Sequence, residues 1–296
     1  FIRAAGGAPA NVAAAVAQLG GSSALVSQVG EDAFGTFLLK SLQAEGVDTR
    51  WVFRTDRANT GLAFVSLDAN GEREFSFFRN PSADLFLNEQ QIVPEMFQGC
   101  AALHFCSVDL VDRPVKAAHR RAIELARWAG ALISFDPNVR LPLWDDPAAC
   151  QSAIREFLPV SDVVKLSSDE LAFATGEADE RAAAEKLFSL GCGLLVVTRG
   201  QEGSAAYASR ACAQAESLAV PVADTTGAGD SFIGSFLFQL ARDGVARADL
   251  AALSAEDLAR YLAFSSRYAA LTVQREGARM ASMDEFARAY EGEGGR

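Results

Sequence analysis

Residues 224–234 read Asp-Thr-Thr-Gly-Ala-Gly-Asp-Ser-Phe-Ile-Gly, and they carry more structural information than any other stretch of the chain. Small residues and glycine precede a strongly apolar run, whose large residues recur at helical spacing as Phe232, Ile233, Phe236, Leu237 and Leu240. The pattern predicts a buried helix that begins at a glycine-rich turn. The turn residues Gly227, Ala228 and Gly229 leave a backbone with little steric shield. Their N–H groups can therefore face an anion, where the helix dipole also favours negative charge.

Asp230 stands in the first turn of this predicted helix, beside the predicted anion site. A phosphate with a carboxylate base next to it is the minimal arrangement for moving a phosphoryl group onto a hydroxyl. The alternative is a plain turn at the start of a core helix, which for a short Gly-Ala-Gly turn taken alone is equally frequent. An acid this close to a core favours the catalytic interpretation. Gly234 costs the helix about 1 kcal/mol relative to Ala, and predicts close packing or close approach of a ligand.

From about residue 100 onward, short apolar runs alternate with helical patterns. The predicted strands are Ala102–Cys106, Ala131–Phe135, Asp162–Leu166 and Leu194–Thr198, and the predicted helices are Arg113–Ala129, Pro147–Phe157 and Asp179–Leu190. Such alternation predicts an α/β fold with a parallel sheet and helices on both faces. Ligands of such sheets bind beyond the carboxyl ends of the strands. Residues 136–140, 165–170 and 198–200 each follow or end a strand, so we expect them to gather at one edge.

The N-terminal third has a different pattern. Thr60–Leu67 and Glu72–Phe78 are β-rich runs joined around Asp68 to Gly71, and Asn-Gly within that joint is a strong hairpin signal. An isolated hairpin is only marginally stable, and this one is rich in phenylalanine. We therefore expect it to cover another surface. The alternative is an ordinary hairpin packed on its own domain.

Composition limits the classes of function. The chain has 296 residues, 50% hydrophobic content and a net charge of -11, which favours neither nucleic acid nor an anionic membrane as a partner. No apolar stretch approaches the roughly 20 residues of a membrane span. The five cysteines are scattered without a Cys-x-x-Cys pair, which predicts a reduced, cytoplasmic setting. His104 and His119 are the only histidines, which disfavours a zinc site or a Ser-His-Asp triad. No Gly-Lys dipeptide of a Walker A loop and no Gly-x-Gly-x-x-Gly fingerprint is present.

The run at 224–234 resembles the C-terminal signature of the ribokinase-like (PfkB) sugar kinases. Further matches follow in family order from residue 6 to about residue 278, and they are 6–12, 19–21, 28–32, 79–84, 136–140, 165–170 and 197–200. Within the family the chain is most similar to bacterial fructokinases. The resemblance implies a ribokinase-like three-layer αβα domain with a mostly parallel central sheet (6–50 and 80–290), and an inserted β-sheet lid (1–5 and 51–79). Family members begin with a strand that this sequence lacks, so we expect an N-terminal segment beyond the residues given.

The resemblance also implies a reaction. We expect a cytoplasmic, ATP-dependent kinase that converts D-fructose to fructose 6-phosphate, with Mg²⁺ and also K⁺ as cofactors and a homodimer formed through the lid. Aminoimidazole riboside kinase and 2-keto-3-deoxygluconate kinase are alternatives within the class. Outside it stand a non-catalytic sugar or nucleoside sensor and a dinucleotide oxidoreductase. Intact Gly227, Gly229 and Asp230 disfavour the sensor, and the missing fingerprint disfavours the oxidoreductase.

Individual residues receive roles from this resemblance. Asp230 is the expected base, and the N–H groups of Gly227, Ala228 and Gly229 form the anion hole. The expected sugar-binding residues are Gly6, Gly7, Asn11, Arg79 and Arg140. The expected nucleotide-binding residues are Lys165, Thr198, Gly200 and Ser266, with Arg199 beside them. Glu170 is expected to organise Mg²⁺ through water, and the expected monovalent-cation residues are Asp224, Thr226, Thr272, Arg275 and Gly277.

Several of these residues have a simpler interpretation. Asn11 could be a plain helix N-cap, and Arg79 and Arg140 could be ordinary surface residues. Glu170 could merely place negative charge in the first turn of a helix. Two motifs depart from the family pattern: Ser167 stands in place of Asn in the motif of Glu170, and Ser265-Ser266 replaces Ala-Asn near the expected adenine pocket.

Overall fold

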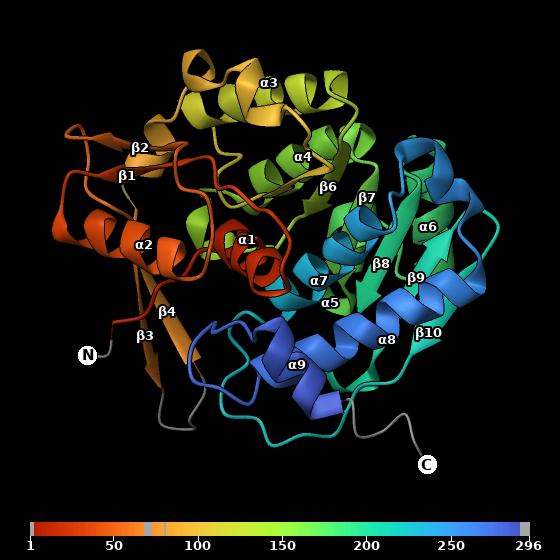
Figure 1. The fold of residues 1–296 in the computed structure, drawn as a ribbon. Helices are drawn as coiled ribbons and strands as arrows, with labels where there is room; N and C mark the ends of the chain where they lie inside the picture. The colour runs from red at the N-terminus through yellow and green to blue at the C-terminus, as the bar shows by residue number, and fades with distance from the viewer. Residues whose placement is uncertain (1–2, 68–72, 80, 291–296) are drawn as a thin grey trace.

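The alternation of apolar runs and helical patterns forms a sheet with helices between its strands. The computed structural model describes residues 3–67, 73–79 and 81–290 (Figure 1). In this part of the chain the main sheet has the strand order β10-β9-β8-β7-β6-β5. Its strands are β5 (Ala102–Cys106), β6 (Leu132–Asp136), β7 (Val163–Ser167), β8 (Leu194–Thr198), β9 (Ser204–Ala208) and β10 (Cys212–Ala215). The four predicted strands are confirmed to within one residue.

Strands β5 to β8 are parallel, β9 is antiparallel to β8, and β10 is antiparallel to β9. Every residue of β6 is buried, as are the first four residues of β7 and of β8. Continuous burial is typical of parallel strands that are covered on both faces. It also explains why these segments appear in the sequence as unbroken apolar runs.

Helices cover both faces of the sheet. One face packs against α3 (Pro114–Trp128), α4 (Pro147–Phe157), α5 (Ser168–Thr175) and α6 (Glu180–Ser189). The other face packs against α7 (Ala228–Arg242) and α8 (Ala255–Thr272), with Val12 of α1 (Ala8–Gln18) in the same core. Residues from alternate positions of each strand enter the two cores, for example Val164 in the first and Val163 in the second. The expected three-layer αβα architecture is therefore confirmed (Figure 1).

Helices α1 and α7 pack closely because Gly234 has no side chain. A Cβ at Gly234 would lie 2.8 Å from Cβ of Ala15 and 3.0 Å from the carbonyl oxygen of Val12. Of the two explanations that the sequence offers for this glycine, the structure shows close packing. A third core joins α1 to α8, α2 (Ala33–Ala44) and α9 (Met283–Tyr290).

The start of α1 differs from the sequence expectation. Asn11 was one candidate for its N-cap, but the helix begins at Ala8 and Gly7 is the N-cap residue, with φ of 110°. That backbone angle suits glycine, and Pro9 is tolerated in the first turn, where no amide hydrogen is needed. The N-cap interpretation of Asn11 is therefore wrong, and its side chain is available for a contact elsewhere.

The N-terminal third contributes two small sheets. Strand β1 (Ser27–Gly30) pairs in parallel with β2 (Val52–Thr55). Strand β3 (Leu62–Leu67) pairs antiparallel with β4 (Arg73–Phe78), which confirms the predicted hairpin, and Figure 1 shows this pair extending away from the layers. The predicted Asn70-Gly71 turn, Asn80, Phe1, Ile2 and the tail after Tyr290 lie outside the described residues. The proposed division into a lid and a main domain stays a prediction, although β2 pairs with a strand from the segment 6–50.

Two observations concern the composition-based expectations. In the described ranges no helix combines the length and apolar character that crossing a bilayer requires. The five cysteines are unpaired, and Cys106, Cys150 and Cys192 are buried.

Candidate active site

The glycine-rich turn and the start of α7 lie beside the carboxyl ends of the parallel strands. Gly227 is the N-cap of α7 and has φ of 80°. A Cβ at this position would lie 2.7 Å from Cβ of Ala278, so both the backbone angle and the space require glycine. The N–H group of Ala228 donates to the carbonyl of Thr225 at 3.2 Å, which closes the turn. Of the three predicted anion-hole amides, that of Ala228 is thus already engaged in the turn.

Asp230 is held by a residue from the opposite end of the chain. The amide nitrogen Nδ2 of Asn11 donates to Oδ2 of Asp230 at 2.7 Å. Burial raises the pKa of Asp230 to about 6, although the hydrogen bond from Asn11 acts in the opposite direction. The charge of Asp136 raises the pKa further, whereas Lys165 and Arg140 lower it. A carboxylate with a pKa near the working pH can take a proton and release it again, as a general base must.

Two predicted arginines differ in what they contact. Arg140 is exposed beside the site, and its charge acts on Asp230. Arg79 is half-buried and forms an ion pair with Asp84. It also donates to the carbonyl of Val108 at 3.0 Å. Arg79 therefore joins the end of β4 to the loop after β5. Gly6 and Gly7 are exposed just before α1.

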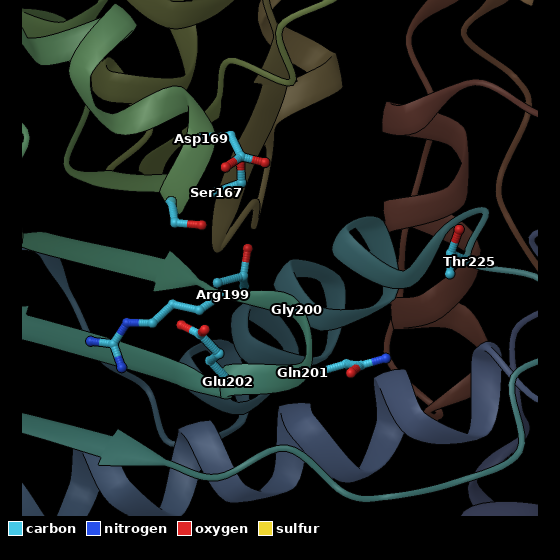
Figure 2. Close-up of a pocket in the computed structure, with 9 residues that line it drawn as sticks. Ser167, Asp169, Arg199, Gly200, Gln201, Glu202 and Thr225 are labelled. Atoms are coloured by element: carbon cyan, nitrogen blue, oxygen red, sulfur yellow. The ribbon is translucent and has the colours of Figure 1, made fainter. Parts of the chain in front are cut away.

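A pocket of about 790 Å³ opens next to the glycine turn (Figure 2). Its lining residues include Thr198 and Gly200, which the sequence predicted as nucleotide contacts, and Thr225, two residues before Gly227. Gly200 has φ of 58°. The pocket therefore connects the end of β8 with the turn that carries Asp230. Its volume is in the usual range for small-molecule sites.

Other residues near this pocket depart from the expectation. Arg199 lines it, but its guanidinium pairs with Glu180 through two contacts of 2.6 Å and is directed away from Gln201 (Figure 2). Ser266 does not line the pocket. Its Oγ lies 3.5 Å from Oγ of Ser204, the strand residue paired with Thr198. Sequence reasoning missed the lining residues Asp169, Gln201 and Glu202, although their position just after β7 and β8 could have identified them.

Lys165 is engaged with another side chain, and its predicted role as a nucleotide contact stays a prediction. Its Nζ donates to Oδ2 of Asp136 at 2.9 Å, and both side chains are almost fully buried. Burial disfavours the charged amine, but Asp136, Glu170 and Asp230 outweigh that effect and raise the pKa of Lys165. Lys165 is therefore a permanent positive charge beneath the site.

Glu170 ties the start of α5 to the loop after β6. Its Oε2 accepts a hydrogen bond from N of Ser167 at 2.9 Å, and its Oε1 accepts one from N of Val139 at 2.5 Å. The interpretation of Glu170 as part of a helix start is confirmed. Its role toward Mg²⁺ stays a prediction.

The predicted monovalent-cation residues come together only in part. Asp224 accepts hydrogen bonds from N of Thr226 at 2.7 Å and from N of Gly277 at 2.9 Å. Thr272 is buried and donates to the carbonyl of Tyr268. Arg275 pairs with Glu285 at 3.0 Å. In the described part of the chain, no group of three or more His, Cys, Asp or Glu side chains is arranged to hold a metal ion.

Comparison with known proteins places this geometry in context. The model of the pfkB family of carbohydrate kinases matches residues 1–285. "Probable fructokinase-5" of Arabidopsis thaliana is 40% identical over 279 residues, which are 94% of this chain and 85% of that relative. The crystal structure of a Xylella fastidiosa fructokinase with bound ATP superposes with a TM-score of 0.93 at 36% identity, covering 99% of this chain and 92% of that one. A Vibrio cholerae fructokinase solved with fructose, ADP and calcium has a TM-score of 0.82 at 34% identity, covering 95% and 87%.

Proposed function

Because the chain belongs to the pfkB family of carbohydrate kinases, we propose that it transfers the γ-phosphoryl group of ATP to D-fructose, giving fructose 6-phosphate and ADP. The chain is a phosphotransferase that acts on a sugar hydroxyl. The observation that carries the proposal is the position of Asp230. It follows the glycine turn at the edge of the 790 Å³ pocket, and Asn11 holds one of its two oxygens.

The residues present account for each part of the transfer. Asp230, with a pKa of about 6, is largely ionised at neutral pH and accepts the proton of the primary hydroxyl through Oδ1. The hydroxyl oxygen then bonds to the γ-phosphorus as the bond from that phosphorus to the bridging oxygen breaks and ADP leaves. The backbone at Gly227 and Gly229 and the helix dipole stabilise the charge on the transferred group. Arg140 supplies further positive charge beside Asp230.

The nucleotide fits the pocket lined by Thr198 and Gly200, because its volume suits a ligand of that size. Asp169 and Glu202 add carboxylates to the lining, and carboxylate and water oxygens are the ligands of Mg²⁺. Both oxygens of Glu170 already accept backbone hydrogen bonds, so Glu170 would hold Mg²⁺ through water. When bound, Mg²⁺ neutralises phosphate charge.

We also propose a monovalent cation beside Asp224. Its carboxylate lies between the segment before α7 and the segment after α8, and the amides of Ala223 and Asp224 donate to the carbonyl of Val273. Backbone carbonyls and one carboxylate form a donor set that suits K⁺. We expect faster turnover in potassium than in sodium buffer, and equal rates would contradict the assignment.

The hairpin β3–β4 is proposed as a lid over the sugar and as the surface that a second copy of this chain contacts. Phe78 is 64% exposed and Phe64 38% exposed, and their rings are in contact at 5.3 Å between centroids. An aromatic surface of this kind favours a covered position. Light scattering should give the mass of a dimer for the parent chain and that of a monomer for Phe78→Asp. A monomeric parent would exclude the dimer.

A panel of substrates tests the reaction. Coupled ADP release is measured with fructose, aminoimidazole riboside and 2-keto-3-deoxygluconate, with the impaired variant Asp230→Asn as the reference. We expect the highest kcat/KM with fructose. Preference for another substrate would reassign the specificity within the family. Failure of every substrate to raise ADP release above the reference would favour a sensor that binds sugar without turnover.

A further inference from the structure

The ion pair between Lys165 and Asp136 is almost fully buried between two strands of the main sheet, and its presence there is difficult to explain by stability alone. The two residues come from the neighbouring parallel strands β7 and β6, one residue beyond the paired positions Phe135 and Val164. Their side chains are 7% and 2% exposed. Breaking such a pair is costly, but replacing both partners with neutral groups is often neutral or stabilising. A buried pair at this place therefore invites a functional explanation.

The positive end of the pair touches the glycine turn. If Gly229 carried a Cβ, that atom would lie 3.1 Å from Nζ of Lys165. The ammonium group thus lies against the backbone of the residue directly before Asp230. A cation at a helix N-terminus is opposed by the helix dipole. Asp136 holds it there at 2.9 Å in spite of this.

The groups around Asp230 divide by charge. Asp136 at the end of β6 is the nearby negative group, whereas Arg140 of the loop after β6 and Lys165 of β7 are positive. Asn11 of α1 is a neutral donor. Cys106 at the end of β5 stays a neutral thiol, because burial and the charges of Asp136 and Asp230 raise its pKa. Lys165 and Asp136 form one ion pair, and its two charges shift the pKa of Asp230 in opposite directions.

We propose that Lys165 and Asp136 are positioning residues for the base: the pair fixes the electrostatic field at Asp230 and thereby the pH range in which this carboxylate can accept a proton. The inference rests on the proposed function only in naming Asp230 as the base. Lys165 favours the ionised form of Asp230, and Asp136 favours the protonated form. The burial of the pair makes the effect strong, because neither charge is screened by water.

Two variants separate this role from a structural one. Asp136→Asn keeps an oxygen that can accept from the amide of Asn138, as Asp136 does at 3.1 Å, but removes the negative charge. The double variant Asp136→Asn/Lys165→Met removes both charges. The ¹³C NMR signal of the Asp230 carboxyl, assigned by its loss in Asp230→Asn, is titrated in each protein. This readout requires no turnover.

We expect Asp230 to titrate about one pH unit lower in Asp136→Asn, because one opposing charge is gone and the cation remains. In the double variant the titration returns toward that of the parent. The acid limb of kcat/KM with fructose should move in the same way. Unchanged titration of Asp230 in Asp136→Asn, or a double variant in which Asp230 titrates as low as in Asp136→Asn or lower, would overturn the proposal. If the pair had only a structural role, the variants would have lower melting temperatures, but Asp230 would titrate at the same pH in the single and in the double variant.

Circular dichroism verifies the fold of each variant. If Asp136→Asn is unfolded, Lys165→Met replaces it. Two carboxylates then share one site without the buried cation, and only the exposed Arg140 remains, so the last of Asp136 and Asp230 to ionise should do so at higher pH than Asp230 in the parent. An equal or lower pH would overturn the proposal. If the titrations behave as expected but the kinetic limb does not follow, Asp230 is not the base, and the proposed function fails rather than the inference.

Discussion

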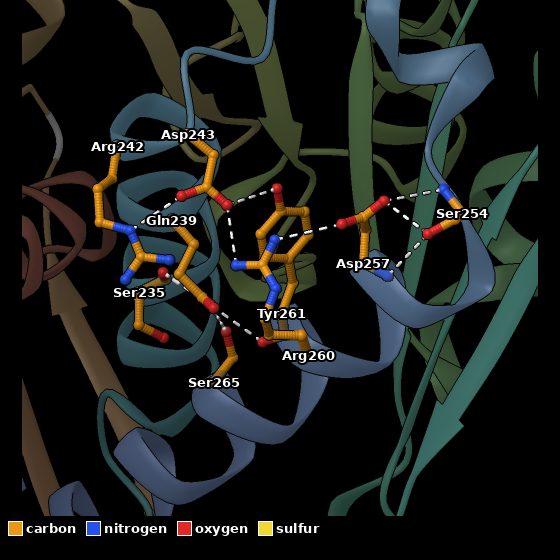
Figure 3. A network of polar contacts seen from close by, with 9 residues as sticks. All are labelled: Ser235, Gln239, Arg242, Asp243, Ser254, Asp257, Arg260, Tyr261 and Ser265. Carbon is orange, nitrogen blue, oxygen red and sulfur yellow. Dashed lines mark hydrogen bonds and ion pairs between the residues drawn. The ribbon is translucent and has the colours of Figure 1, made fainter.

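The two ends of helix α7 each carry an aspartate, and the pKa values of the two carboxyls are shifted in opposite directions. At the first turn, burial raises the pKa of Asp230 to about 6. At the other end, Asp243 is exposed, and hydrogen bonds from Arg242, Arg260 and Tyr261 lower its pKa to about 2 (Figure 3). One carboxyl is poised to exchange a proton near neutral pH, and the other is permanently ionised. The comparison teaches that the surroundings, and not the residue type, separate a candidate base from a structural acid.

The network at the second end also fixes α7 in place. The buried Nε2 of Gln239 donates to the carbonyl of Tyr261 at 3.0 Å and lies 3.4 Å from Oγ of Ser265, so α7 is bound to α8 (Figure 3). Arg260 pairs with both Asp243 and Asp257. The second end of α7 is therefore held by several polar contacts with α8, whereas the first end follows the turn whose Thr225 lines the pocket.

The largest expected difference is between two single variants, in which one of the two aspartates is replaced by asparagine. Asp230→Asn should lower kcat by about 100-fold or more, because a positioned base is lost. Asp243→Asn is the matched control on the same helix, and its kcat should stay within about twofold of the parent. Steady-state ADP release with fructose measures both. Equal effects of the two variants would remove the distinction between the helix ends.

A second comparison concerns the glycine at each end. Gly227→Ala should lower the free energy of unfolding by about 2–4 kcal/mol, because it combines a positive φ with a blocked Cβ position. Gly244 also has a positive φ of 67°, but nothing lies within 4 Å of its Cβ position. Gly244→Ala should therefore cost only about 1 kcal/mol. Urea unfolding of both variants checks the difference. A smaller cost at Gly227 would show that the turn can rearrange.

The pH dependence of stability should have opposite signs at the two ends. Asp230 binds its proton more tightly in the folded state, so its contribution is present below about pH 4 and is lost as the pH rises through 6. Asp243 contributes above about pH 4, and that contribution is lost as the pH falls toward 2. At pH 7, Asp230→Asn should be about 1–3 kcal/mol more stable than the parent. Urea titrations from pH 3 to 8 measure the slopes, and a destabilised Asp230→Asn would contradict the raised pKa.

The smallest expected effect is at the contact between the helices. Gln239→Met removes the buried donor and should lower the free energy of unfolding by about 1 kcal/mol. Its kcat should stay close to that of the parent, because Gln239 lies near the end of the helix remote from Asp230. Thermal unfolding and ADP release measure the two quantities. A large loss of kcat in Gln239→Met would show that the contact between α7 and α8 affects the position of Asp230.

The sequence predicted local structure better than it predicted which side chains contact one another. The strands, the helix after Gly227 and the place of Asp230 at its start followed from periodicity and from the glycine turn. The N-cap interpretation of Asn11 failed because Gly7 adopts the required backbone angle. The true partner of Asn11 lies 219 residues away, and no local pattern encodes such a contact.

Charged residues were predicted least well, because their roles depend on which opposite charge is nearest in space. Lys165 pairs with Asp136 and Arg199 with Glu180, and neither ion pair was among the sequence-based expectations, which placed both residues near the nucleotide. Glu170 was correctly placed at a helix start, but its contact with Val139 comes from the fold.

The pH profile of kcat/KM for fructose phosphorylation tests the account most directly. If Asp230 is the base, log kcat/KM is level above about pH 7 and falls by one unit for each pH unit below about 6, and the residual activity of Asp230→Asn lacks this limb. A parent profile that stays level down to pH 5, or the same limb in Asp230→Asn, would show that another group accepts the proton.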